Sequence, residues 1–158
     1  MDYCKISRNE CIATGELFAT LMHYLAEITP EHLSSEGTSL LEWASRIGKY
    51  VSTHEHWGIL ARDEGTPVGF ILFAVNRRGI PFIRKRYLVI DDLFVSNSHR
   101  NRGIAKELLG IARQAAINYG CSCIELDVLS TNVPAQEFYQ HNGFKPMQMH
   151  MCMTLTDK

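Results

Sequence analysis

The sequence has 158 residues, of which 46% are hydrophobic and 21% charged, and its formal net charge at pH 7 is -1. This composition predicts one globular domain, large enough to bury about 70% of its unfolded surface. The charge disfavours nucleic acid or a membrane surface as a partner, and no run approaches the ~20 apolar residues of a membrane span. No apolar signal segment follows Met1, so we expect a soluble, cytoplasmic protein.

The first 56 residues are predicted to be largely helical. Apolar residues recur at helical spacing over 17–28, and Pro30 closes that segment. The same spacing recurs over 40–51, after a loop rich in serine and glycine. We therefore expect two amphipathic helices in 1–56.

Strands are predicted next, at 57–62, 67–76 and 87–95. The first two flank Asp63-Glu64-Gly65-Thr66, whose composition is typical of a hairpin turn. The tripeptide His54-Glu55-His56 lacks the spacing of a helical pair of metal ligands, so we interpret it as a turn that enters the first of these strands.

After the third strand, the period of the apolar residues becomes helical over 103–120. A strand is predicted over 123–129, where Ile, Leu and Val alternate with carboxylates. A short helix capped by Asn132 runs to Gln140, and alternating methionines predict a last strand over 147–155.

This order of elements predicts an α/β sandwich: one central, mixed, mostly antiparallel sheet flanked by about four helices in a single domain. The five cysteines form neither an even framework nor a Cys-x-x-Cys pair, so we expect buried, reduced thiols and predict no metal site. They are Cys4, Cys11, Cys121, Cys123 and Cys152.

Two arginines stand at the predicted start of the helix over 103–120. Cations at a helix N-terminus are unfavourable by about 0.3 to 1 kcal/mol each, so Arg100 and Arg102 are poorly placed for stability alone. A bound phosphate or pyrophosphate would make their position favourable, and Gly103 would let the backbone approach it closely. Phosphate motifs of the P-loop and dinucleotide-binding types are absent from the sequence.

The segment 87–144 resembles the core of the GNAT-type N-acetyltransferase superfamily. The acetyl-CoA motif of that superfamily is Arg or Gln, two residues, Gly, one residue, then Gly or Ala, and Arg100, Gly103 and Ala105 match it. The strand before it lies at the family distance. The run 132–139, followed by Gly143-Phe144, is similar to the second signature of the family.

The resemblance implies one acetyltransferase domain over 1–158, with an acetyl-CoA-binding core over 87–144 and a helical, acceptor-side region over 1–56. Acetyl-CoA would be the acetyl donor, with its pyrophosphate on the helix start and its pantetheine arm paired like an added strand. Asn132 could contact the cofactor, cap its helix, or do both. The implied cofactor-binding residues are Leu93, Phe94, Val95, Arg100, Asn101, Arg102, Gly103, Ile104, Ala105, Lys106, Asn132, Ala135 and Tyr139.

Acetyl transfer to an amine requires a base, because an amine with a pKa near 10.4 is neutral in only about one molecule in 2,500 at pH 7. It also benefits from an acid that protonates the departing thiolate. The resemblance implies that Tyr139 is this acid. The alternative is that Tyr139 packs with Ala135 and Phe138 in the buried stripe of a short helix.

For the base, Asp91 aligns with a glutamate common in the family, and Asp92 follows it. Neighbouring strand residues point to opposite faces, so one of the two should face the amine unless the strand bulges, and we choose Asp91. Aspartate is shorter than glutamate by about 1.5 Å, which favours a water relay. Glu125 and Asp127 are reserve candidates, and a solvated strand face is the favoured role of Glu125.

The resemblance implies an acceptor with a primary amine: a polyamine or diamine, an amino acid, an aminoglycoside-like molecule or a peptide. Similarity to the diamine and polyamine branch is weaker. A basic loop would repel a polycation if it lined the acceptor site, but it could also be a solvated loop, or receive an acidic acceptor or the 3′-phosphate of CoA. Its residues are Arg77, Arg78, Arg84, Lys85 and Arg86.

Two further alternatives stay open on sequence alone. The same fold could bind acyl-CoA as a sensor or interaction module without catalysis. A homodimer could form through the edge of the predicted methionine strand, because an unpaired strand edge can pair with a second copy.

Overall fold

A computed structural model describes residues 1–81, 83, 86–153 and 155. The chain forms two compact units, residues 1–127 and 128–158. The second unit contains α4 (Val133–His141), and the first contains β1 (Asp2–Lys5), η1 (Arg8–Glu10), α1 (Cys11–Ile28), α2 (Leu40–Val51), β2 (His56–Asp63), β3 (Thr66–Arg77), β4 (Arg86–Val95), η2 (Asn97–His99), α3 (Ile104–Asn118) and β5 (Ile124–Leu126).

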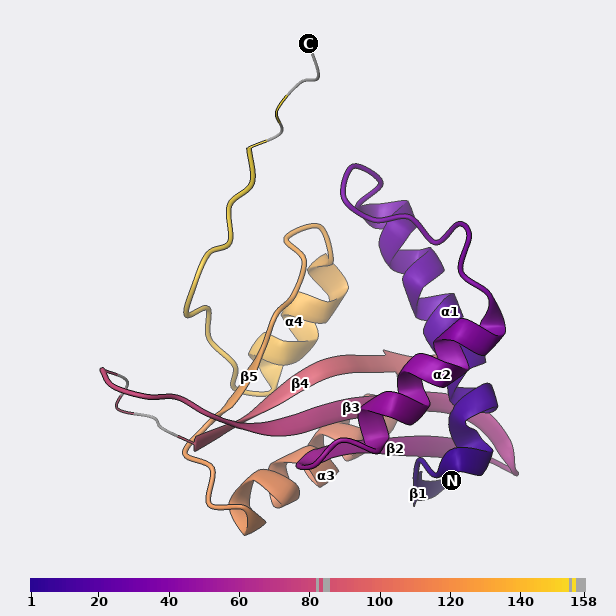
Figure 1. Ribbon diagram of the computed structural model, residues 1–158, viewed down its shortest axis with the longest axis horizontal. Helices are drawn as coiled ribbons and strands as arrows, with labels where there is room; N and C mark the ends of the chain where they lie inside the picture. The colour runs from indigo at the N-terminus through magenta and orange to yellow at the C-terminus, as the bar shows by residue number, and fades with distance from the viewer. Residues whose placement is uncertain (82, 84–85, 154, 156–158) are drawn as a thin grey trace. The chain divides into compact units, whose positions relative to one another are not determined.

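One mixed sheet organises the first unit, with its strands in the order β1-β2-β3-β4-β5. Neighbouring strands are antiparallel except β4 and β5, which are parallel. Helices α1 and α2 lie on one face of the sheet and α3 lies on the other (Figure 1). The predicted α/β sandwich with a mostly antiparallel sheet is confirmed.

The hairpin between β2 and β3 is tight. Only Glu64 and Gly65 separate the two strands, and both have positive φ, 48° and 83°. Two successive positive φ values are typical of the hairpin turn whose twist matches that of the strands, and glycine adopts them at little cost. The predicted hairpin is therefore confirmed, with β2 one residue longer at each end.

The core on the α1 and α2 face is aromatic. Phe18 of α1 packs against Phe70 of β3, and Phe70 packs in turn against Phe94 of β4, at ring-centroid distances of 6.0 and 6.2 Å. Ile47 of α2 joins the same cluster and is almost fully buried. Each such side chain contributes about 1.5 to 3 kcal/mol when removed from water, which fixes α2 over the sheet.

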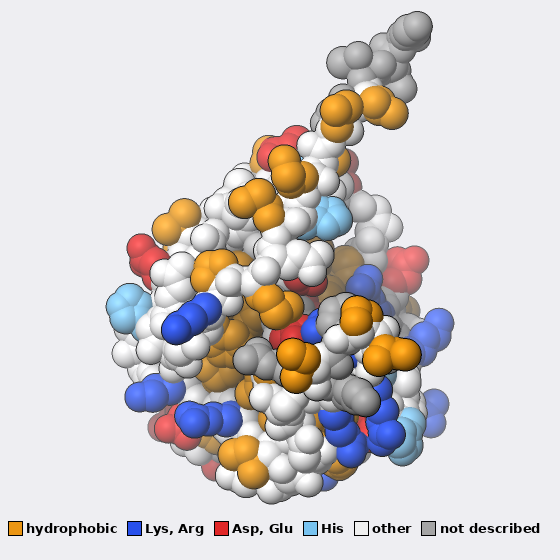
Figure 2. Space-filling view, turned by 90° about the vertical axis from the view of Figure 1, so that its left-hand side faces the viewer, with side chains coloured by type: hydrophobic (Ala, Val, Ile, Leu, Met, Phe, Trp, Pro, Cys, Tyr) orange, Lys and Arg blue, Asp and Glu red, His pale blue; other side chains and the backbone are white. Residues whose placement is uncertain are grey.

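The sequence predicted three of the strands poorly. β1 was not predicted, and the predicted strand over 123–129 is confirmed only over 124–126. The predicted strand over 147–155 is wrong: in its described residues the backbone has no strand pairing. Hydrophobic side chains stand exposed along this segment (Figure 2), and the exposed fraction of Met149 is 79%. Alternation alone does not make a strand, because the backbone also needs a hydrogen-bonding neighbour.

Helix α1 begins six residues earlier than predicted, at Cys11. A capping box precedes it, in which Ser7 and Glu10 each bind the backbone of the other residue. This reciprocal capping satisfies backbone groups at the start of the helical segment. Among the described residues, no helix is long and apolar enough to cross a membrane.

Candidate active site

A bulge in β4 brings the two predicted carboxylates to one face of the sheet. Leu72 pairs with Asp92 and Phe73 pairs with Ile90, so Asp91 is an extra residue in β4. Asp92 shares the face of its partner Leu72, which belongs to the core under α1 and α2. Asp91 reaches the same face, because it accepts a hydrogen bond from Tyr50 of α2. A regular strand would have separated the two side chains.

The two carboxylates have different surroundings. Asp91 is exposed and accepts a hydrogen bond from the Tyr50 hydroxyl. Asp92 is half-buried, and burial raises its pKa to about 6; the charge of Asp91 adds to the rise and the charge of Arg46 opposes it. Burial, followed by the hydrogen bond to Asp91, raises the pKa of Tyr50 far above its usual value, so this hydroxyl stays a donor.

One side of α2 faces the carboxylates. Trp43, Arg46 and Tyr50 follow each other at intervals of three and four residues, which places them on the same side of the helix. The Arg46 guanidinium lies 5.7 Å from the ring centre of Phe18 and 6.0 Å from that of Trp43. Tyr50 packs edge-on against His56 of β2 at 4.7 Å.

These α2 residues and His56 were missed by the sequence analysis. Their spacing on α2 is visible in the sequence, but the same stripe suits ordinary packing of an amphipathic helix. The signal that distinguishes them is tertiary, because Tyr50 and Asp91 are 41 residues apart and meet only when α2 packs on the sheet.

Strands β4 and β5 pair over a short distance. Their last pair is Ile90 with Leu126, whereas β4 continues to Val95. In the part of the first unit that the structure describes, no strand pairs with residues 93–95 on the β5 side. This edge presents backbone groups to which an extended ligand can hydrogen-bond.

The predicted anion site follows β4 directly. Gly103 is the N-cap of α3 and has a φ of 82°, and a Cβ placed there would meet nothing within 4 Å. Asn101 also has a positive φ, 62°. The backbone N–H groups of the first helical residues, Ile104, Ala105 and Lys106, have no carbonyl of their own helix to bind. The helix start is therefore open for an anion.

The positive charges around this site repel one another less than the sequence predicted, because a carboxylate lies among them. Asp63, at the end of β2, lies 3.2 Å from Arg102 and 3.6 Å from the His99 ring nitrogen. Arg100 donates to the Val95 carbonyl at 3.2 Å and lies over the ring of Tyr24. The carboxylate of Asp63 therefore offsets part of the unfavourable interaction between these cations and the helix start, which a bound phosphate would also offset.

Within the second unit, the predicted helix cap is present. The Asn132 side chain accepts a hydrogen bond from the Ala135 amide at 3.4 Å, at the start of α4. The half-buried ring of Tyr139 lies edge-on to Phe138 and Phe144, at 5.3 and 5.5 Å. The capping role of Asn132 is confirmed, and its contact with a cofactor stays a prediction.

The favoured role of Glu125, a solvated strand face, is wrong. Glu125 is half-buried and binds Arg78 through both of its oxygens, one of them at 2.8 Å. The reserve base Asp127 is exposed.

The basic loop is largely neutralised where it is described. Arg78 pairs with Glu125 and stacks over the ring of Tyr87 at 4.0 Å. Arg86 pairs with Glu55 at 2.7 Å. Arg84 and Lys85 lie outside the described residues, and Arg77 is exposed. Two of the loop arginines therefore already have carboxylate partners, which weakens the argument against a cationic acceptor.

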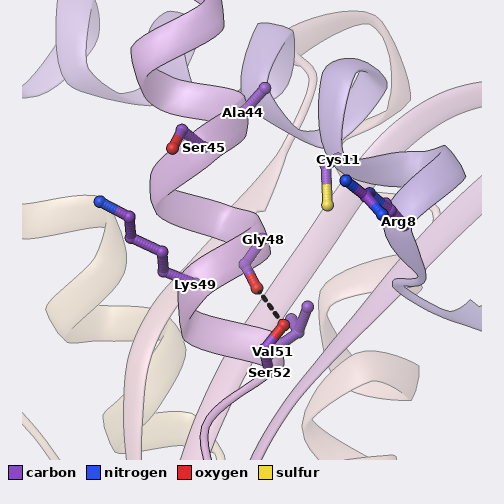
Figure 3. Close-up of a pocket in the computed structure, with 8 residues that line it drawn as sticks. All are labelled: Arg8, Cys11, Ala44, Ser45, Gly48, Lys49, Val51 and Ser52. Atoms are coloured by element: carbon purple, nitrogen blue, oxygen red, sulfur yellow. Dashed lines mark hydrogen bonds between the residues drawn. The ribbon is translucent and has the colours of Figure 1, made fainter.

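A surface hollow lies on the other side of α2 (Figure 3). Its lining includes Ala44 and Gly48 of α2, together with Ser52 after the helix, Cys11 and Arg8. With about 3.6 residues per turn, these α2 residues point away from Tyr50 and Arg46. The hollow is therefore separate from the carboxylate pair and takes no part in the chemistry derived from that pair.

Sequence comparisons relate the chain to one family of known proteins. The sequence matches the Acetyltransferase (GNAT) family over residues 18–144. It is 26% identical to the uncharacterized N-acetyltransferase YhfO of Bacillus subtilis over 110 residues. This match covers 68% of this chain and 72% of that protein. Several other N-acetyltransferase relatives are longer, and the matched regions span 29% to 48% of their length.

Solved structures share the fold at low sequence identity. A mutant of the BH1408 protein from Bacillus halodurans superposes with a TM-score of 0.89 at 16% identity, over 99% of this chain and 100% of that one. The aminoglycoside N-acetyltransferase AAC(6′)-Iy, in complex with CoA, gives a TM-score of 0.74 at 16% identity, over 99% and 100%. With most of its length matched, the chain belongs to the GNAT family of acetyltransferases and is an acyltransferase.

Proposed function

We propose that the protein transfers the acetyl group of acetyl-CoA to a primary amine at the bulge of β4. The observation that carries this proposal is that the bulge puts Asp91 and Asp92 on one face, at the point where β4 parts from β5. An acetyl donor paired with the free edge of β4 would bring its thioester to these carboxylates.

The donor is held by the same strand and the loop that follows it. Backbone N–H groups at the start of α3 bind the pyrophosphate, because the helix dipole favours negative charge there and Gly103 leaves the approach open. The edge of β4 over 93–95 binds the pantetheine arm. Acetyl-CoA supplies the activated acetyl group, and the residues of the chain bind it and move protons.

Asp92 is the better candidate for the base, in place of Asp91. With its pKa raised to about 6, Asp92 is ionised at pH 7 yet more basic than an ordinary aspartate. Asp91 is held by the Tyr50 hydroxyl and serves to bind the ammonium group of the acceptor. The bound ammonium gives a proton to Asp92, directly or through one water, and becomes the neutral nucleophile.

Bond formation then follows from the neutral amine. Its nitrogen attacks the thioester carbonyl carbon, and the tetrahedral intermediate collapses as the carbon–sulfur bond breaks. Tyr139, which matches the family's tyrosine, donates a proton to the departing thiolate. The tyrosine regains a proton from the nitrogen that becomes the amide, and Asp92 releases its own proton to water, so that amine and acetyl-CoA yield amide and CoA.

The test is release of the CoA thiol from acetyl-CoA over a panel of primary amines. We expect turnover with at least one amine, and a loss of about 10²- to 10⁴-fold in kcat for Asp92→Asn, the range typical of general base catalysis. Tyr139→Phe is expected to lower kcat by a similar factor while acetyl-CoA binding is little changed. If acetyl-CoA binds but no amine is acetylated, the proposed function is wrong.

A further inference from the structure

One cation stands beside the carboxylate pair without a carboxylate partner of its own. Arg46 lies one helical turn before Tyr50 on α2, on the side that faces Asp91 and Asp92. Its charge acts on Asp92, but among the described residues it forms no ion pair. Arg78 and Arg102, by contrast, are each paired with a carboxylate.

The surroundings of Arg46 hold its guanidinium in place. It is exposed to solvent, and it lies over the rings of Phe18 and Trp43 at 5.7 and 6.0 Å. At about 6 Å, a guanidinium is attracted to the face of an aromatic ring, which restricts its motion without using its N–H donors. These donors form a planar fork that matches a carboxylate.

We propose that the acceptor is a primary amine that also carries a carboxylate, with its ammonium group at Asp91 and Asp92 and its carboxylate on Arg46. This inference rests on the proposed function, because it adds a second contact for the same acceptor. A free guanidinium beside the amine site attracts an anionic group and repels a second ammonium. The amino acid class therefore fits this site better than the diamine and polyamine class.

Pairs of acceptors that differ only in the carboxylate provide the test. Glycine and methylamine, β-alanine and ethylamine, ornithine and putrescine, and lysine and cadaverine are four such pairs, with increasing separation between the amine and the carboxylate. Rates of CoA release with acetyl-CoA give kcat/KM for each compound. For the pair whose spacing suits the site, we expect the carboxylated member to be favoured by about 10- to 100-fold, the range of a charge-assisted hydrogen bond.

Variants of Arg46 identify the source of this preference. Arg46→Gln is expected to reduce the ratio within the pair to about one, mainly through a higher KM for the carboxylated member. Arg46 also acts on the base Asp92, but that effect is common to both members and cancels in the ratio. Arg46→Lys keeps the charge but not the fork, so it should retain an intermediate preference. Arg113→Gln on α3 is the matched control: it removes one exposed arginine on the opposite face of the sheet and should leave every ratio unchanged.

The outcomes separate this inference from the proposed function. Preference for the decarboxylated members, or a wild-type preference that survives Arg46→Gln, overturns the inference while acetyl transfer stands. If another amine is acetylated and none of the eight compounds is, the inference is likewise overturned while acetyl transfer stands. Binding of acetyl-CoA with no turnover of any amine overturns both.

Discussion

Burial of the Asp92 carboxylate lowers the stability of the folded protein at neutral pH. Burial raises its pKa to about 6 from 3.8, so folding favours the protonated form. Below pH 4 this cost is absent; as the pH rises from about 4 to about 6, the free energy of unfolding falls, and it stays at the lower value above pH 6. The side chain remains partly exposed, which reduces the cost.

Replacing Asp92 by Asn should therefore stabilise the protein at pH 7. We expect a gain of roughly 1 to 3 kcal/mol, since one pKa unit corresponds to about 1.4 kcal/mol, and the gain should vanish toward pH 4. Urea denaturation at both pH values measures it. Asp127→Asn, which removes an exposed carboxylate, is the control; an equal gain in the two variants would contradict the burial argument.

Tyr50 holds Asp91 in position to bind the acceptor. Tyr50→Phe removes only the hydroxyl, so the ring should keep its contact with His56 while Asp91 loses its donor. We expect kcat/KM for the amine to fall by about tenfold, the value of one hydrogen bond to a charged group, with the Kd of acetyl-CoA unchanged. Calorimetry and steady-state rates check both; an unchanged kcat/KM would remove Tyr50 from the site.

The sequence predicted Asp91 and Asp92 as site residues but did not predict their partners. The two carboxylates lie in a predicted strand, and the resemblance to the family implied that one of them is the base. The contact from Tyr50 depends on how α2 lies over the sheet, and the common face of the two carboxylates depends on the bulge at Asp91. Neither feature leaves a local pattern in the sequence.

The start of α3 combines an open anion site with a backbone conformation that favours glycine. Gly103 has a φ of 82°, which costs most other residues about 1 to 2 kcal/mol. Gly103→Ala should destabilise the protein by about this amount and weaken acetyl-CoA binding, because the methyl group would occupy open space through which the pyrophosphate approaches the amides.

Gly110 provides the matched control within the same helix. It is exposed in the middle of α3, and a Cβ there meets nothing within 4 Å. Gly110→Ala should stabilise the protein by up to about 1 kcal/mol through helix propensity and leave acetyl-CoA affinity unchanged. Denaturation and calorimetry on both variants decide; identical effects of the two alanines would argue against an anion site at Gly103.

Elements with local signals were predicted well. The period of the apolar residues predicted α2 and α3, and Glu64-Gly65 predicted the hairpin. β1 was not predicted, because a strand of four residues at a sheet edge shows little pattern of apolar and polar residues. The methionine segment shows the opposite error, since a strong pattern has no strand to pair with among the described residues.

Binding of acetyl-CoA should be visible as an increase in the stability of the folded protein. A ligand that binds only the folded state at 100 times its Kd adds about 2.7 kcal/mol to the free energy of unfolding, which raises the Tm by several degrees. The increase should shrink as salt rises, because phosphate contacts near Arg100 and Arg102 are screened. Thermal unfolding with and without acetyl-CoA measures it; no change in Tm would contradict the cofactor assignment.

The net charge of -1 and the family match describe the molecule as a whole but do not select its acceptor. The division into acceptor-side and cofactor-side regions, 1–56 and 87–144, stays a prediction. In the first unit, Tyr50 of α2 contacts Asp91, and the loop before α3 follows β4.

The dependence of kcat/KM for the amine on pH, measured for the wild type and Asp92→Asn, shows whether Asp92 is the base. With Asp92 as base, the wild-type value rises about tenfold per pH unit below pH 6 and is level from there to the pKa of the amine. Asp92→Asn should lack the inflection near pH 6 and climb about tenfold per pH unit up to the amine pKa, because only the neutral amine then reacts. If the variant profile matches that of the wild type in shape and height, Asp92 is not the base.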